Sequence, residues 1–145
     1  MSNKKWNKLI KIINGNRFFK KQTKPKKFFK VVTWNKGNYH FRSDNEKFLP
    51  VKTAIEDQSG DIIVFTEAKF SPKDESDILG QFQDYEIHFK IIPGAINACI
   101  MMMVKKNTVN ITRLENIEEP ATSCMWFKIK TQDTNFVLAT LYRQW

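Results

Sequence analysis

Cysteine, histidine, glycine and proline are all scarce in this chain of 145 residues, which has 2 Cys, 2 His, 5 Gly and 5 Pro. Two cysteines without a C-x-x-C pair exclude a disulfide scaffold, and two scattered histidines exclude a structural zinc site. So little glycine and proline excludes collagen-like and low-complexity chains. No apolar run approaches the roughly 18 residues of a membrane-spanning helix. This composition is typical of an intracellular protein, nuclear or cytoplasmic, with reduced cysteines.

Acidic residues are absent from the first 43 positions, which carry 13 Lys and Arg. Positions 44–145 carry 11 Lys and Arg against 15 Asp and Glu, so the net charge of +9 comes from the N-terminal region. We therefore divide the chain into a basic arm, residues 1–27, and a mildly acidic body, residues 28–145. The arm predicts a polyanionic partner, either a nucleic acid such as DNA or an anionic membrane surface.

The arm contains two successive patterns. Residues 5–13 have apolar side chains at helical spacing, and the Asn-Gly-Asn of 14–16 is a stop signal. The stretch that follows is basic with two Phe pairs, and its Pro25 argues against a continuous helix. We expect a partly helical or disordered arm. Its candidate phosphate contacts are Lys24, Lys26 and Lys27.

Hydrophobic patterns in the body predict a β-α-β unit followed by about five mostly antiparallel strands, which makes a layered α/β or α+β domain. The expected elements are a strand at 28–34, a helix ending near 59 with Gly60 as its stop, a strand at 62–65, a short helix at 78–82, and strands at 84–91, 97–104, 109–114, 125–130 and 136–142. The uninterrupted apolar runs at 62–65 and 136–142 are typical of strands covered on both faces. In the strand at 84–91, polar residues alternate with apolar ones, which predicts one solvent-facing side.

Two polar residues follow the first two strands directly. Asn35 ends the first strand and Glu67 comes just after the second, and in open α/β sheets ligands bind at the carboxyl ends of strands. A hard cation such as Mg²⁺ would offset the cost of placing a carboxylate beside an apolar strand. Taken alone, Glu67 also suits a solvated loop, and Asn35 suits a turn.

Five segments resemble, in order, successive blocks of the endonuclease/exonuclease/phosphatase superfamily, the DNase-I-like group. They are VVTWNKGN, DIIVFTEAK, GAINACIMMMVKKN, CMWFKIK and FVLATLYRQ, and together they span about residues 29–144. The resemblance is strongest to the endonuclease domains of non-LTR retrotransposons. It implies the first half of a four-layered α/β sandwich, a DNA phosphodiesterase activity, and an origin in a retrotransposon reverse-transcriptase polyprotein.

The resemblance also implies roles for individual residues. Glu67 matches the metal-binding Glu, a ligand of Mg²⁺ (or Mn²⁺), and Asn35 matches the active-site Asn beside the metal. Lys69 matches a basic residue that orients this Glu. Tyr142 matches the catalytic Tyr that hydrogen-bonds the scissile phosphate, and Arg143 is placed to contact phosphate. Metal and neutral or cationic donors are what phosphodiester hydrolysis needs, because charge develops on the phosphate oxygens.

The family's G-D-x-N segment and its C-terminal Asp-His pair are absent from this sequence. We therefore expect the remaining C-terminal half of the domain to be missing, and the chain alone to be weakly active. Without a second sheet, the inner faces of residues 99–103 and 136–141 are expected to be exposed, which favours aggregation.

Two other functions fit parts of the sequence. A non-enzymatic nucleic-acid-binding module would use the basic arm, whose Trp6 and four Phe could stack on bases. A superfamily phosphatase or sphingomyelinase acting on small or lipid phosphates would use the amphipathic arm at a membrane surface.

Overall fold

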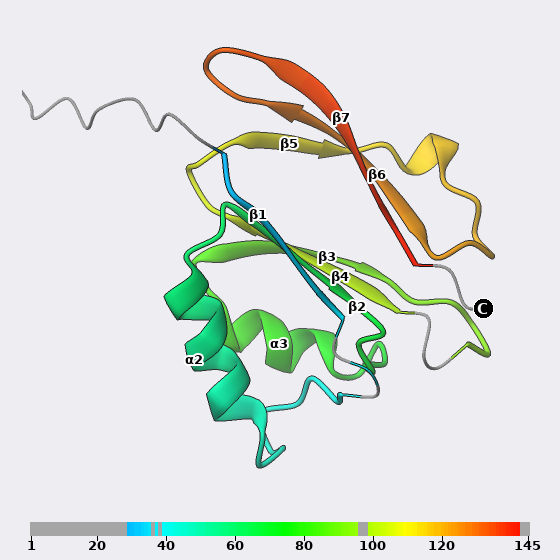
Figure 1. Ribbon diagram of the computed structural model, residues 1–145. Helices are drawn as coiled ribbons and strands as arrows, with labels where there is room; N and C mark the ends of the chain where they lie inside the picture. Colours follow the sequence, from blue (N-terminus) through cyan, green and yellow to red (C-terminus); the bar gives the residue numbers. More distant parts are fainter. Residues whose placement is uncertain (1–28, 36, 38, 96–98, 143–145) are drawn as a thin grey trace, which may run out of the picture.

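The computed structural model describes residues 29–35, 37, 39–95 and 99–142 (Figure 1). The arm of residues 1–27 lies outside the described residues, as do Lys24, Lys26, Lys27 and Arg143. Within the described part, no helix is long and apolar enough to cross a membrane.

Two β-sheets form the body. The first has the strand order β1-β2-β4-β3 and the second the order β5-β6-β7. The strands are β1 (Val31–Asn35), β2 (Ile62–Thr66), β3 (Tyr85–Lys90), β4 (Ile100–Lys105), β5 (Asn110–Arg113), β6 (Cys124–Lys130) and β7 (Asn135–Leu141). Strands β1 and β2 are parallel, and all other pairs are antiparallel. The expected layered α/β architecture is confirmed.

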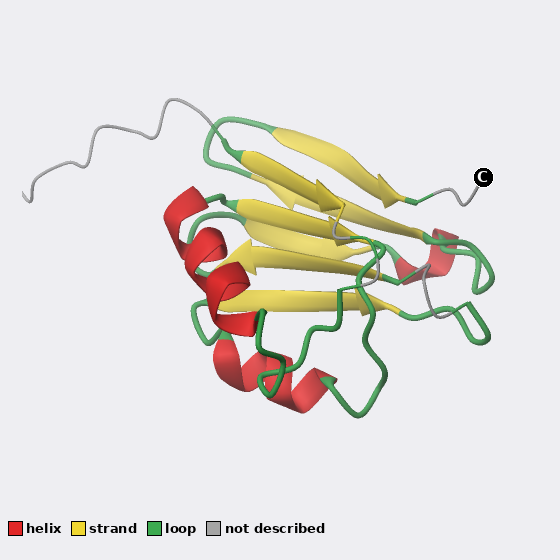
Figure 2. Cartoon of the chain, turned by 60° about the horizontal axis from the view of Figure 1, so that its bottom comes forward, coloured by secondary structure: helices red, strands yellow, loops and turns green. Residues whose placement is uncertain are grey.

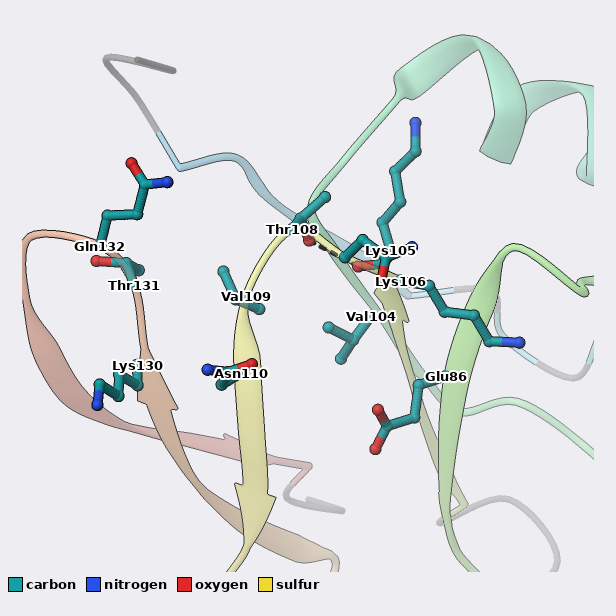
Figure 3. Close-up of a pocket in the computed structure, with 11 residues that line it drawn as sticks. Glu86, Val104, Lys105, Lys106, Thr108, Val109, Asn110, Lys130, Thr131 and Gln132 are labelled. Carbon is teal, nitrogen blue, oxygen red and sulfur yellow. Dashed lines mark hydrogen bonds between the residues drawn. The ribbon is translucent and has the colours of Figure 1, made fainter.

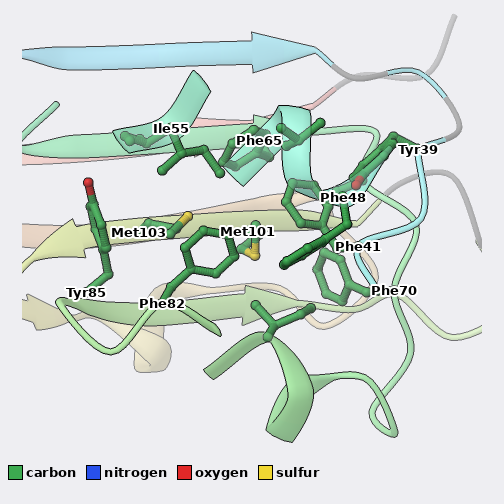
Figure 4. Close-up of a cluster of buried hydrophobic side chains, with 14 of the residues drawn as sticks. Tyr39, Phe41, Phe48, Ile55, Phe65, Phe70, Phe82, Tyr85, Met101 and Met103 are labelled. Carbon is green, nitrogen blue, oxygen red and sulfur yellow. The ribbon is translucent and has the colours of Figure 1, made fainter. Parts of the chain in front are cut away.

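Two helices, α2 (Phe48–Gln58) and α3 (Glu75–Gln81), cover one face of the first sheet (Figure 2). Helix α2 buries Phe48, Val51 and Ile55, whose spacing of three and four residues places them on one helix face. These side chains join β2 and β4 in an aromatic-rich core (Figure 4). The helix ends one residue earlier than the expected stop, because Ser59 adopts the left-handed conformation (φ 47°) and Gly60 does not.

The second sheet covers the other face of the first. Met125, Phe127 and Ile129 of β6 pack on the alternate side chains of β2 and β4 in a second core. Residues 99–103 are therefore fully buried, and the expectation that this face lies open is wrong. Both faces of β2 are covered, as its unbroken apolar run predicted. The chain itself supplies the three strands that close the sandwich.

Strand β7 differs from its predicted environment. It pairs only with β6 in the described part of the chain, so it is an edge strand. In addition, only one of its two faces is covered. Phe136 and Leu138 pack against the second core, while Val137 and Leu141 on the opposite side are 57% and 65% exposed. An all-apolar run cannot distinguish an edge strand from a central one, because it carries no alternation to mark the solvent side.

The polar side of β3 is covered at His88 and Lys90, contrary to the sequence prediction, whereas Glu86 on the same side is exposed. His88 packs edge-on against Phe127 of the second sheet, with 5.0 Å between ring centroids. Lys90 is buried and donates to the Glu118 carboxylate (3.4 Å) and to the Glu119 carbonyl (3.1 Å). The alternation of polar and apolar residues therefore marks one packed face and one partly packed face, and on the latter Lys90 is paired with Glu118.

Candidate functional site

The carboxyl ends of β1 and β2 lie side by side because the two strands are parallel and in register. Asn35 at the end of β1 pairs with Thr66, and Glu67 is the next residue after Thr66. Tyr142 follows the end of β7 in the second sheet, where its backbone N–H donates to the carbonyl of Ser123 (2.9 Å). Residues from three strands and both sheets thus meet at one edge of the sandwich.

Glu67 is the centre of this cluster. Its carboxylate accepts hydrogen bonds from the Tyr142 hydroxyl and from the Asn35 side-chain amide. The Asn35 carbonyl oxygen Oδ1 accepts the backbone N–H of Gly37 (3.0 Å). This second bond fixes the orientation of the amide, so that its NH₂ group faces Glu67. We define Glu67, Asn35 and Tyr142 as the Glu67 site.

Both hydrogen-bonded partners influence ionisation in this site. The hydrogen bond from Tyr142, followed by that from Asn35, lowers the pKa of Glu67 below its ordinary value. The same contact with Glu67 raises the pKa of the Tyr142 hydroxyl. At neutral pH the site therefore holds an anionic carboxylate beside a neutral hydroxyl donor.

The backbone at Glu67 is strained. Glu67 has a φ of 58°, a left-handed conformation that costs a non-glycine residue about 1–2 kcal/mol. The two residues that follow hold this geometry, since Ala68 is fully buried and Lys69 is bonded through its backbone to Tyr39 (2.8 Å) and Phe41 (3.1 Å). Backbone strain maintained by its surroundings is typical of functional sites.

Gly37 lies beside the Glu67 carboxylate, a contact that the sequence alone does not predict. A Cβ atom at residue 37 would lie 3.5 Å from Oε2 of Glu67 and 4.0 Å from Oδ1 of Asn35. The positive φ of Gly37 (31°) keeps a side chain from being favoured there. The site consequently has an open side next to the carboxylate, and the glycine two residues after Asn35 is the sequence signal for it.

Glu67 is the residue of the site that could hold Mg²⁺ or Mn²⁺, with low affinity. Glu67 offers carboxylate oxygens at a solvent-accessible edge, which are ligands that hard cations prefer. Among the described residues, no group of three or more His, Cys, Asp and Glu could form a full metal cage. Mg²⁺ commonly binds through one or two carboxylates, waters and substrate phosphates, so one carboxylate meets this minimum.

Of the sequence-predicted site residues, the structure brings Asn35, Glu67 and Tyr142 together. Lys69 lies two residues beyond Glu67, in a short backbone bridge with His40. The contact of Ser123 with the backbone of Tyr142 was not predicted, because the residue before β6 carries no sequence signal for it.

No protein-family profile matches this chain, and no curated protein matches it. Among solved structures, it is similar to the endonuclease domain of TRAS1, a telomere-specific non-LTR retrotransposon. The TM-score is 0.52 with 11% sequence identity, and the match covers 80% of this chain and 46% of that chain. The chain therefore has the DNase-I-like layered fold and spans about half the length of this neighbour.

Proposed function

We propose that this chain belongs to a Mg²⁺-dependent endonuclease domain that hydrolyses DNA phosphodiester bonds. The observation that carries the proposal is the Glu67 site, in which an ionised carboxylate and two neutral hydrogen-bond donors meet at the carboxyl edge of a DNase-I-like sheet. The structural neighbour is an endonuclease domain, which supports the same reaction class.

Each residue of the site has a distinct proposed role. Glu67 holds the metal ion, Mg²⁺ or Mn²⁺, and the hydrogen bond from Asn35 keeps the carboxylate in one orientation. When bound, the metal would supply charge stabilisation to phosphate oxygens. Tyr142 presents a hydroxyl that stays protonated, and its single proton would turn from Glu67 to a non-bridging oxygen of the scissile phosphate when substrate binds.

We further propose that the basic residues bring DNA to this edge. Lys69 and Arg143 lie within two residues of the site in the chain, and the arm contributes Lys24, Lys26 and Lys27. Phosphate neutralisation by such residues supplies most of the sequence-independent affinity for DNA. A retrotransposon origin and a nuclear or cytoplasmic location accord with this role. The match covers 46% of the neighbouring chain, so the proposed activity belongs to a whole domain that is larger than the matched part.

The test is metal-dependent nicking of supercoiled plasmid by the purified chain. We expect slow nicking with Mg²⁺ or Mn²⁺ that stops when a chelator is added, because one carboxylate holds the metal weakly. Nicking that persists with chelator would contradict the proposal. DNA binding without nicking in either metal would favour the non-enzymatic binding module instead.

Tyr142→Phe is expected to shift the pH dependence of metal binding. The hydroxyl is the largest cause of the low pKa of Glu67, so its removal raises that pKa toward the ordinary value. Metal binding requires the ionised carboxylate, and the acid limb of Mn²⁺ affinity should therefore move to higher pH. The measurement is free Mn²⁺ by electron paramagnetic resonance across a pH series. Tyr85→Phe, the same change at the opposite end of the sheet, should leave the curve in place.

A further inference from the structure

A second polar hollow lies at the end of the sandwich away from Glu67. It has a volume of about 810 Å³ and lies between two turns, the β4–β5 connection and the β6–β7 hairpin (Figure 3). Its basic residues are Lys105, Lys106 and Lys130, and its acidic residue is Glu86. We call this hollow the lysine groove.

The chemistry of the groove suits an extended polyanion. Besides the lysines, its lining contains amide and hydroxyl side chains that donate hydrogen bonds, namely Asn107, Thr108, Asn110, Thr131 and Gln132. Among the described residues that line it, only Val104 and Val109 are apolar, and none is aromatic. A ligand held here would be bound through phosphate, because nothing in the lining offers a surface on which a base could stack.

Hydrogen bonds within the two turns hold the groove walls. The hydroxyl Oγ1 of Thr108 donates to the carbonyl of Lys105, and Lys106 Nζ donates to the carbonyl of Gln83 (2.7 Å). In the hairpin, the backbone N–H of Thr131 donates to the carbonyl of Thr134 (2.9 Å). The lysines are therefore carried by fixed backbone rather than by a long loop.

The groove adjoins the point where the basic arm joins the body. The carbonyl of Lys30 accepts the backbone N–H of Asp61 (2.9 Å), and the carbonyl of Asp61 accepts that of Lys105 (2.9 Å). Phe29 packs against Phe136, the second residue of β7, with ring centroids 5.8 Å apart. Phe29 and Lys30, the described residues before β1, thus lie near the two turns.

The groove and the Glu67 site lie at opposite ends of β2. The backbone N–H of Lys105 donates to the carbonyl of Asp61, the residue just before β2, and Glu67 follows the last residue of β2. Six steps of extended chain separate Asp61 from Glu67, which corresponds to about 20 Å at roughly 3.3 Å per residue.

We propose that the lysine groove binds the sugar-phosphate backbone of a nucleic-acid strand, without base specificity, at the end of the sandwich away from the Glu67 site. The binding function of the groove needs no metal and stands apart from the proposed hydrolysis. A lipid surface is the other polyanion with phosphate chemistry, but the recessed polar lining, with two valines, offers no protruding apolar group for insertion.

The experiment measures binding of the full chain to a fluorescent single-stranded DNA of about 20 nucleotides, by anisotropy over a salt series with chelator present. The triple variant Lys105→Gln, Lys106→Gln, Lys130→Gln should show a slope of log affinity against log salt that is shallower by about 2, at about 0.7 per lost phosphate contact. The matched control is Lys47→Gln, Lys52→Gln, Lys73→Gln, which removes the same charge from the helical side. It should retain the wild-type slope.

Equal slopes for the two triple variants would overturn the proposal, because net charge alone would then explain the binding. The Lys→Arg triple at the groove positions should retain the slope, and its loss there would likewise contradict a phosphate contact. Vesicles with anionic phospholipid form a further arm of the test, and lysine-dependent binding to them in preference to DNA would overturn the choice of partner. The binding assay contains chelator and measures no cleavage, so that failure of the nuclease proposal and failure of this one are distinguishable.

Discussion

Replacing Glu67 by glutamine is expected to lower Mg²⁺-dependent plasmid nicking about 10³-fold or more. The substitution keeps the size of the side chain but removes the anionic oxygens that we assign to the metal. Losing a single oxyanion donor already costs about 10²–10³-fold in other enzymes, and the metal stabilises more charge than one donor does. Thermal unfolding of the variant, measured alongside, should show that the chain remains folded.

Glu46→Gln is the matched control for this experiment. Glu46 is exposed and precedes helix α2, so the substitution makes the same change in charge away from the sheet edge. We expect wild-type nicking from it. A Glu67→Gln chain that nicks within a factor of about two of wild type would place the metal elsewhere and remove the basis of the proposed mechanism.

The largest expected effect on stability comes from Glu118, which joins the two sheets. Its carboxylate accepts hydrogen bonds from Arg113 Nε (3.0 Å) and Arg113 Nη2 (2.8 Å), from the backbone N–H of Trp126 (3.1 Å) and from Lys90 Nζ (3.4 Å). Arg113 Nη1 also donates to the carbonyl of Phe89 on β3 (3.0 Å). The side chains of Glu118 and Lys90 are only 4% and 10% exposed.

Glu118→Gln is therefore expected to reduce the free energy of unfolding by about 3–5 kcal/mol, the usual cost of leaving buried charges without their partner. Both Arg113 and Lys90 would remain positive in a region that water hardly reaches. Denaturant unfolding followed by circular dichroism gives the value. Glu119→Gln is the control, because only the backbone carbonyl of that residue contacts Lys90, and a change below about 0.5 kcal/mol is expected. Similar losses in the two variants would contradict the assigned role of the cluster.

The same cluster makes stability depend on pH in a defined direction. Burial alone would raise the pKa of Glu118, but the hydrogen bonds from Arg113 and Trp126, with the charges of Arg113 and Lys90, bring it below its ordinary value. A carboxyl whose pKa is lower in the folded state stabilises the protein above its unfolded pKa. That contribution is lost as the pH falls through the folded value. In Glu118→Gln, this part of the acid sensitivity should be absent.

The order of the elements and the location of the Glu67 site could be predicted because both depend on local rules. Apolar runs mark buried strands, and parallel neighbours bring their carboxyl ends to one edge, which places Asn35 beside Glu67. The contact of Glu67 with Tyr142 joins residues 75 positions apart on different sheets. No periodicity indicates such a pairing, and only the family resemblance suggested it.

The packing between the sheets could not be predicted for a related reason. A strand pattern shows which residues share a face, but not what covers that face. The alternation of Glu86, His88 and Lys90 therefore indicated solvent, whereas the second sheet packs on His88 and the β5–β6 connection binds Lys90. The run of apolar residues in β7 indicated a central strand, whereas its position is decided by which strands lie next to it.

The left-handed backbone at Glu67 has a consequence for how this protein would change under selection. A penalty of about 1–2 kcal/mol is a sizeable part of a typical domain's total stability of about 5–15 kcal/mol. Glycine and asparagine tolerate this conformation better than glutamate does, so a screen for heat resistance alone would enrich them at position 67. Under the proposed nuclease function, copies of the gene that no longer need this activity would drift in the same direction, because relief of the strain and loss of the carboxylate occur in one substitution.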